Sequence, residues 1–395
     1  MTTQTTYELL SQTIQRLLPE VVETRHHLHQ NPELSDREEK TATFVAERLR
    51  ALGMDEVRER VGGYGVVGVL RGAKPGPTFA FRADMDALPI QEENDLPYKS
   101  CNPGVMHACG HDGHTSTLLG TAATLAQLRD RIPGTIKFLF QPAEETVGGA
   151  ARMCAEGVME GVDAIVALHG WPGMEVGQIG VRSGPAMASA DTFDITIQGC
   201  GAHAAMPHIG VDPIVVGAQV VTALQTLASR EISPTDSVVV TVTQFHAGTA
   251  YNIIPGTAEL KGTVRCLSRA VRDSMAERIE RVVAGVCSAL RAEYTFQHRP
   301  GTPVTINDAG FNALVAEVGA ELLGAENVFH LDAPSMGAED FGIFLHHAPG
   351  AMFRLGVGAD MPPLHTPCYN FADAALPKGI ELFCRIALRY LETPR

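Results

Sequence analysis

Apolar residues in the first part of the chain occur in two patterns, helical spacing and short continuous runs, which take turns along the sequence. Ser35 and Glu38 match a capping box, and the apolar residues behind them recur at helical spacing, which predicts a helix from 36 to 52. Leucines at similar spacing predict another helix near 112 to 128. Short apolar runs, typical of strands buried on both faces, lie at 66–70, 78–83, 135–140 and 164–168. Together they predict an α/β fold whose open, mostly parallel sheet carries helices on both faces.

From about residue 186, apolar residues alternate with polar ones, as in strands with one wet face. The alternating runs lie at 193–197, 238–242 and 258–264, with helical stretches at 212–229 and 270–291. The first pattern then returns, with a helix near 308–324 and a strand at 351–355. We therefore predict a discontinuous domain, 1–185 and 300–395, interrupted by a smaller α+β domain at 186–299.

The composition limits the class of protein. A chain of 395 residues exceeds the size at which one core keeps growing, so two domains are expected. The net charge of −14, without a basic cluster, argues against nucleic acid as a partner. Apolar runs stay well below ~18 residues and the first residues lack a secretion pattern, so we expect no membrane association and a cytoplasmic location. The eight scattered cysteines are expected to be reduced.

Candidate metal ligands follow four of the predicted strands. In open α/β sheets, ligands bind beyond the carboxyl ends of the strands, so side chains there are expected to converge on one edge. The candidates at strand ends are Asp84, Asp86, Glu144, Glu145, His169 and His365. The loop 106–114 adds His107, Cys109, His111 and His114. Thiolate, imidazole and carboxylate together suit zinc, and also manganese, cobalt or nickel.

The adjacent carboxylates Glu144 and Glu145 are the most informative pair. Side chains alternate in direction along extended backbone, so one carboxylate can bind a metal while the other handles a proton. Among the three histidines of the loop, His111 is preferred to His107 and His114 as a partner of Cys109. The residues therefore predict a metal site with a general base beside it.

Six stretches of the chain, in this order, resemble the amidohydrolase branch of the M20 metallopeptidase family, which includes hippurate hydrolases, N-acyl-amino-acid amidohydrolases and auxin-conjugate hydrolases. These stretches are 82–89, 106–114, 141–145, 169–172, 201–208 and 364–367. The resemblance begins at Arg25 and covers nearly the whole chain. One departure is that the family's usual His-x-Asp pair lacks its first His, and Asp84 and Asp86 stand in that region.

The resemblance implies a site for two divalent metal ions (zinc, manganese, cobalt or nickel) with Glu144 as general base. The implied metal ligands are Cys109, His111, Glu145, His169 and His365. Asp86, counted with the catalytic residues, and Asp84 would orient these ligands. The implied reaction is hydrolysis of the amide bond of an N-acyl amino acid, hippurate-like or N-acetylated, by a water that bridges the metals. The products would be a carboxylic acid and a free amino acid.

The resemblance also implies that the inserted domain acts as a lid and that it forms the interface of a homodimer or of a dimer-based oligomer. Asn252 and Arg265 are expected to bind the carboxylate of the substrate, for which arginine offers a bidentate fork. His203 is expected to reach the partner's active site and donate a hydrogen bond to the oxyanion.

Two alternatives stay open at this point. Cys109 with His111 or His114 contains the nucleophile and base of a cysteine amidase, although several metal-ligand candidates then have no role. A non-catalytic binding protein of the same fold is the other alternative, although Glu144 then has no use as a base. Metal removal and an assay of amino acid release separate the three hypotheses.

Overall fold

The computed structural model describes residues 3–146 and 148–392 and divides into two compact units, which we describe separately. The first unit runs to Ala186 and includes 306–333 and the described residues from Asp340 onward. The second unit comprises Met187–Thr305 and the short segment Pro334–Glu339. Within the described residues, no helix combines the length and apolar character that crossing a bilayer requires.

The first unit is built on an eight-stranded sheet with the order β1-β2-β4-β3-β5-β16-β6-β14. Its strands are β1 (Glu56–Val61), β2 (Gly65–Arg71), β3 (Lys74–Asp84), β4 (Pro133–Gln141), β5 (Ala164–Trp171), β6 (Ile179–Val181), β14 (Val328–His330) and β16 (Gly350–Gly356). The central strands β4, β3, β5 and β16 are parallel to their neighbours within this group, whereas β1–β2, β2–β4 and β16–β6 are antiparallel pairs. The predicted open, mostly parallel sheet is confirmed, and its parallel part lies at the centre.

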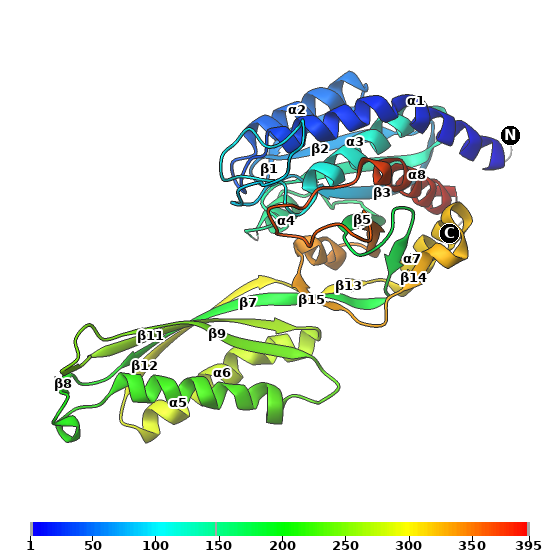
Figure 1. Ribbon diagram of the computed structural model, residues 1–395. Helices are drawn as coiled ribbons and strands as arrows, with labels where there is room; N and C mark the ends of the chain where they lie inside the picture. Colours follow the sequence, from blue (N-terminus) through cyan, green and yellow to red (C-terminus); the bar gives the residue numbers. More distant parts are fainter. Residues whose placement is uncertain (1–2, 147, 393–395) are drawn as a thin grey trace. The chain divides into compact units, whose positions relative to one another are not determined.

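Helices cover both faces of this sheet (Figure 1). The helices are α1 (Thr3–Gln30), α2 (Glu39–Ala51), α3 (His111–Gln127), α4 (Gly149–Ala155), α7 (Ala309–Leu323) and α8 (Leu376–Glu392), with short 3-10 helices at Arg129–Arg131, Ala325–Asn327, Asp340–His346 (η5) and Asp373–Ala375. Phe79, Phe81 and Ala83 of β3 join the core that contains α1, α2, α3, α7 and α8. Because successive side chains of a strand point to opposite faces, Arg82 points the other way, where it contacts Asp340 of η5.

The second unit is built on four long antiparallel strands in the order β12-β7-β11-β9, with two helices packed against one face. Its elements are β7 (Gly184–Gln198), β8 (Ala202–His203), β9 (Val238–Ala247), β10 (Ile253–Ile254), β11 (Thr257–Cys266), β12 (Glu293–Thr302), β15 (Ser335–Ala338), α5 (Pro213–Thr226) and α6 (Arg269–Ala289), with a 3-10 helix at Pro207–Ile209, while β13 (Thr305–Asn307) begins the return to the first unit. Buried and more exposed residues alternate along β11, as predicted for a strand with one wet face. The strands β9 and β12 form the edges of these four strands.

The division into units differs from the predicted domain boundaries at two places. The strand β12 continues to Thr302 while paired with β7, so the second unit extends past the predicted boundary at 299 to Thr305. The segment Pro334–Glu339 also belongs to the second unit, because β15 pairs with the beginning of β7. A short returning strand of this kind has no periodicity long enough to read from the sequence.

The predicted capping box is wrong. The helix α2 begins at Glu39, three residues later than predicted, and the side chain of its N-cap residue, Glu38, makes no capping hydrogen bond. The hydroxyl of Ser35 instead donates to Asp86 Oδ2 at 2.6 Å, and Glu38 is fully buried and accepts a hydrogen bond from the backbone of Ala143. Both side chains that match the capping pattern are therefore engaged with a distant part of the chain. The helix predicted at 212–229 is also altered, since α5 ends at Thr226 and continues as a π-helix at Leu227–Glu231.

Candidate metal centre

Cys109 and His111 lie on either side of a sharp turn that opens α3. Gly110 between them has φ 88°, and a Cβ at this position would approach the hydroxyl of Tyr369 to 2.7 Å, so glycine suits both the turn and the packing. His111 Nδ1 donates to the backbone carbonyl of Asp86 at 2.8 Å. This hydrogen bond leaves His111 Nε2 as the nitrogen available to a ligand.

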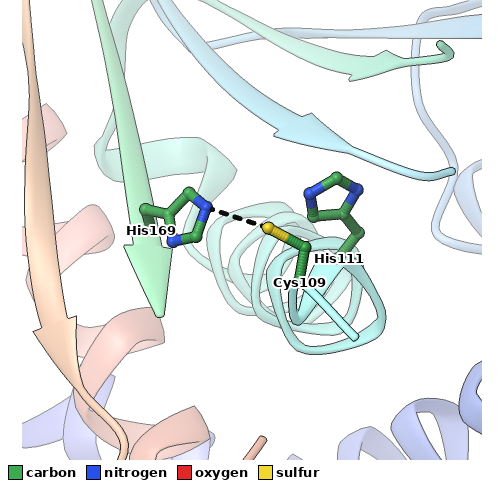
Figure 2. A group of neighbouring side chains, drawn as sticks. All are labelled: Cys109, His111 and His169. Atoms are coloured by element: carbon green, nitrogen blue, oxygen red, sulfur yellow. Dashed lines mark hydrogen bonds between the residues drawn. The ribbon is translucent and has the colours of Figure 1, made fainter. Parts of the chain in front are cut away.

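Three further side chains reach the same place from other strand ends. Figure 2 shows that the sulfur of Cys109 faces the ring of His169. Cys109 Sγ lies 3.5 Å from His169 Nε2 and 3.4 Å from His365 Nε2. Glu145 Oε1 lies 3.4 Å from His365 Nε2 and 3.9 Å from His111 Nε2. His365 is held by its backbone N–H, which donates to the carbonyl of Ala108 at 2.8 Å. The structure thus brings all five predicted metal ligands together within the first unit, beyond the carboxyl ends of the central strands.

The donor atoms fit a metal ion. Donors bound to one tetrahedral cation at ~2.0–2.3 Å lie about 3.5 Å apart, which is close to the separations seen here. In the described part of the chain, the buried atoms His111 Nε2 and Glu145 Oε1 have no hydrogen-bond partner, as expected for atoms that await a cation. Two groups of possible ligands, Cys109–His111–His169 and Cys109–Glu145–His365, share the thiol. The residues therefore fit a centre in which Cys109 is common to two cations.

The same crowding shifts the pKa values of the side chains. The nearby Cys109 sulfur and Glu145 carboxylate raise the pKa of His365 to about 10. Burial alone would lower the pKa of His111, but the charge of Asp84 and the hydrogen bond to Asp86 outweigh it and raise that pKa well above its usual range. Burial raises the pKa of the Cys109 thiol. Without a cation, these three ligands therefore hold their protons at neutral pH.

Zinc binding to the metal-free protein is expected to release protons, because a metal can bind only the deprotonated ligands. At pH 8, below the pKa of about 10 for His365, each chain that takes up zinc should release at least one proton. A pH indicator in weakly buffered solution measures this release, and His365→Ala should release fewer protons at saturating zinc. Because protons compete with the metal, the apparent affinity should rise between pH 7 and 10. Zinc uptake without proton release would contradict the ligand assignment.

The other two histidines of the loop have different environments. His114 Nδ1 donates to Asp84 Oδ1 at 2.6 Å, and His114 Nε2 accepts the backbone N–H of Gly170 at 2.8 Å. Both ring nitrogens are thus engaged, and the ring joins α3 to the end of β5 beside His169. His107 is buried without a hydrogen-bond partner among the described residues, and burial lowers its pKa to about 4, so it is neutral.

Asp86 holds the backbone of the loop that carries the adjacent carboxylates. Its Oδ1 accepts the N–H of Glu144 at 3.2 Å, and its Oδ2 accepts the N–H of Glu145 at 3.0 Å. The strand β4 has already ended at Gln141, and Ala143 adopts a left-handed conformation with φ 49°. The expectation that Glu144 and Glu145 diverge because the backbone is extended is therefore wrong. Both residues instead follow a turn, and a carboxylate oxygen of each lies within 4.8 Å of the other and of a ring nitrogen of His111.

The candidates of the second unit do not form one site within a chain. The strand β8 containing His203 pairs with β10, and the N–H of Ala204 donates to the carbonyl of Asn252 at 3.0 Å, so His203 and Asn252 are neighbours. Both lie beyond the end of β11 that starts at Thr257. At ~3.3 Å per residue, the stretch from Thr257 to Arg265 spans roughly 26 Å. Asn252 and Arg265 of one chain therefore lie toward opposite ends of β11, and their binding of a substrate carboxylate stays a prediction.

A buried polar network behind the ligands was not expected from the sequence. Arg82 donates to Asp84 Oδ2 at 2.6 Å, to Gln141 Oε1 at 2.8 Å and to Asp340 Oδ1 at 3.1 Å. This network joins the ends of β3 and β4 to η5. The signal was available, because an arginine inside a run of buried strand residues must be paired. Glu38 and Ser35 were also missed, since the capping pattern had explained them locally.

Comparisons with known proteins agree with this geometry. A sequence profile of Peptidase family M20/M25/M40 matches residues 80–389. The N-acyl-L-amino acid amidohydrolase of Geobacillus stearothermophilus is 49% identical over 303 residues, which are 76% of this chain and 82% of that protein. The thermostable carboxypeptidase 2 of Saccharolobus solfataricus is 41% identical, covering 97% of this chain and 98% of that protein.

A solved structure shares the fold over nearly the full length. The Bacillus subtilis protein YXEP, described as a dinuclear metal-binding peptidase of family M20, superposes with a TM-score of 0.85 at 35% identity. The match covers 96% of this chain and 99% of that one. The chain therefore belongs to Peptidase family M20/M25/M40 and is a metal-dependent hydrolase.

Proposed function

We propose that this protein hydrolyses the amide bond of N-acyl amino acids and releases a carboxylic acid and a free amino acid. The observation that carries the proposal is the convergence of one thiol, three imidazoles and the Glu145 carboxylate, directly beside a second carboxylate, Glu144. The similarity to an N-acyl-L-amino acid amidohydrolase supports the choice of substrate. The similarity to a carboxypeptidase is compatible with it, since both reactions release an amino acid with a free α-carboxylate.

Two divalent ions, zinc, manganese, cobalt or nickel, would be held by five side chains of the first unit. These ligands are Cys109, His111, Glu145, His169 and His365. When bound, the ions supply Lewis acidity that polarises the amide carbonyl and makes water acidic. Asp86 and Asp84 keep the ligands in place, Asp86 through the backbone of the ligand loop and Asp84 through His114.

Glu144 is the general base in this proposal. It is not needed as a ligand, and its backbone N–H is fixed by Asp86, so its carboxylate can accept the proton of the attacking water. The same carboxylic acid then donates this proton to the amide nitrogen, which must leave as an amine. Cys109 is poorly suited to act as a nucleophile instead, because burial raises its pKa and a nucleophilic cysteine needs a lowered one.

A homodimer through the second unit completes the proposed site. Since His203 and Asn252 lie far from Arg265 in one chain, a substrate whose carboxylate is bound by Arg265 would receive Asn252, and His203 as the oxyanion donor, from the partner. The outer surface of the second unit suits such a contact, because its edge strand β9 is open and many large apolar side chains are exposed. These side chains are Met206, Ile209, Ile214, Val215, Val239, Phe245, Tyr251 and Ile253.

The experiment is a substrate panel with the metal-loaded protein. N-acetyl and N-benzoyl amino acids should release amino acid, whereas their methyl esters should react at least about tenfold more slowly if a free carboxylate is recognised. A dipeptide arm tests the carboxypeptidase reaction. Chelation should abolish release, and zinc, manganese or cobalt should restore it. Activity that survives chelation favours the cysteine amidase, and a protein that binds these substrates without releasing product is the non-catalytic alternative.

A further inference from the structure

Three successive backbone N–H groups beside the metal centre are held by carboxylates. The N–H groups of Glu144 and Glu145 donate to Asp86, as described above. The N–H of the preceding residue, Ala143, donates to Glu38 Oε1 at 2.8 Å. The residues that present the general base and a metal ligand are therefore fixed through their backbone by two acidic side chains, of which only Asp86 was expected to act at the site.

Glu38 occupies an unusual position for a glutamate. Its exposed fraction is 0%, and its Oε2 has no hydrogen-bond partner among the described residues. The same Oε1 also accepts the N–H of Asp36 at 3.1 Å. Ala143 and Asp36 both have left-handed backbone, with φ 49° and 61°, which residues other than glycine rarely adopt. One carboxylate oxygen thus joins two disfavoured conformations that lie more than a hundred residues apart.

The left-handed conformation of Ala143 decides where the next two side chains go. It follows the end of β4 at Gln141 and turns the chain before Glu144 and Glu145. An alanine has no intrinsic preference for this conformation, so the surrounding structure must impose it. The contacts that can do so include the hydrogen bond to Glu38, the longer one that the carbonyl of Ala143 accepts from the N–H of Gly149 at 3.4 Å, and the burial of Ala143.

We propose that Glu38 is a positioning residue of the active site, which holds Ala143 in its left-handed conformation and thereby sets the placement of Glu144 and Glu145. The proposal rests on the proposed function for the roles of these two glutamates. This positioning role requires an oxygen of the Glu38 side chain that accepts a hydrogen bond, and it does not require a negative charge. In agreement, burial raises the pKa of Glu38 to about 7, so part of the population is neutral under ordinary conditions.

A simpler role is stabilisation of the fold, since Glu38 precedes the first residue of α2 and its carbonyl accepts the N–H of Ala42 at 2.8 Å. The two roles predict different results for matched variants. Glu38→Gln keeps an acceptor oxygen toward Ala143, whereas Glu38→Leu fills a similar volume without accepting a hydrogen bond. Glu33→Gln is the control, because the carboxylate of Glu33 accepts N–H groups of Lys40 and Thr41 at the start of the same helix.

With the metal-loaded protein and the best substrate of the panel, Glu38→Leu is expected to lower kcat by about 10- to 100-fold with a smaller change in KM. Metal affinity, measured by competition with a chelating dye, should fall by about tenfold, because Glu145 moves with the loop. Glu38→Gln should stay within about threefold of the wild type in both quantities. Glu33→Gln can lower the melting temperature but should leave both unchanged.

Hydrogen–deuterium exchange gives a readout that needs no substrate. The amides of Gln141 and of 143–146 should exchange at least about tenfold faster in Glu38→Leu than in the wild type, and at the wild-type rate in Glu38→Gln and Glu33→Gln. If no N-acyl amino acid is hydrolysed by the wild type, the proposed function fails while this measurement still decides the positioning role. Equal kcat and equal exchange in the Leu and Gln variants would overturn the proposal. If Glu38→Leu does not fold, a loss of kcat above tenfold in the folded Gln variant would overturn it equally.

Discussion

Glu144→Gln is expected to lower kcat by about 10³-fold or more while the protein keeps its fold and its metal. General-base catalysis is commonly worth ~10²–10⁴, and the same group here also returns the proton to the leaving nitrogen, so both halves of the reaction lose it. Glutamine keeps the size of the side chain, and the backbone N–H at position 144 still donates to Asp86. The measurements are steady-state kinetics and metal content by elemental analysis.

Glu145→Gln is the matched control for this prediction. The exchange is chemically identical and only one residue away, but Glu145 Oε1 lies 3.4 Å from His365 and belongs to the metal centre. It should therefore lower metal content or metal affinity, and excess metal should restore part of its activity. Excess metal should not rescue Glu144→Gln. Turnover above a tenth of the wild-type value in Glu144→Gln, or equal metal content in the two variants with equal activity, would show that their roles are assigned wrongly.

His203→Ala is expected to lower kcat by about 10²–10³-fold, the usual effect of removing one oxyanion donor. The effect should fall on kcat more than on KM, because the negative charge on the carbonyl oxygen develops only in the transition state. The side chain is exposed in the isolated chain, and its Nδ1 accepts the N–H of Ala205 at 3.1 Å, which leaves Nε2 for a partner. His203→Gln should recover part of the loss if an N–H donor is what matters.

The proposed source of this histidine, the partner subunit, is tested by mixing two inactive variants. Equal amounts of His203→Ala and Glu144→Gln, allowed to exchange subunits, form mixed dimers in which one of the two sites contains both native groups. With random pairing, half of the dimers are mixed, so activity should recover to about a quarter of the wild-type value. The control is the same mixture of the two variants, kept under conditions that prevent the exchange of subunits. If the subunits are shown to exchange and the activity does not recover, a contribution of His203 from the partner is excluded.

Much of the first unit was predictable because its signals are local and repeated. The runs at 66–70, 78–83, 135–140 and 164–168 became β2, β3, β4 and β5, each with slightly wider bounds. The convergence of the candidate ligands followed from one rule, that parallel strands present their carboxyl ends at a common edge. That rule needs only the strands and the residues after them, and both are visible in the sequence.

The details that escaped prediction depend on contacts between distant segments. Ser35 and Glu38 match a local capping pattern, but in the structure they form buried hydrogen bonds with Asp86 and with the backbone of Ala143. A buried hydrogen-bond acceptor stabilises the fold more than a solvent-exposed helix cap does. Asn252 and Arg265 are far apart because β11 is long, and the resemblance from which their shared role was taken does not include that length. The helix α1 was missed although its buried residues recur at helical spacing. These are Tyr7, Leu10, Ile14, Val21 and Leu28.

The order in which the strands of the first unit occur along the chain has a consequence for biosynthesis. The strand β16 lies between β5 and β6, yet it is made only after the entire second unit. A nascent chain that ends before Gly350 therefore has β5 with an open edge and lacks His365. The second unit is nearly continuous in sequence and can fold on the ribosome, whereas the first must wait for its C-terminal segment. With His365 as a proposed metal ligand, full metal loading is expected to be a late event, and a chain truncated before His365 is expected to lack a complete centre.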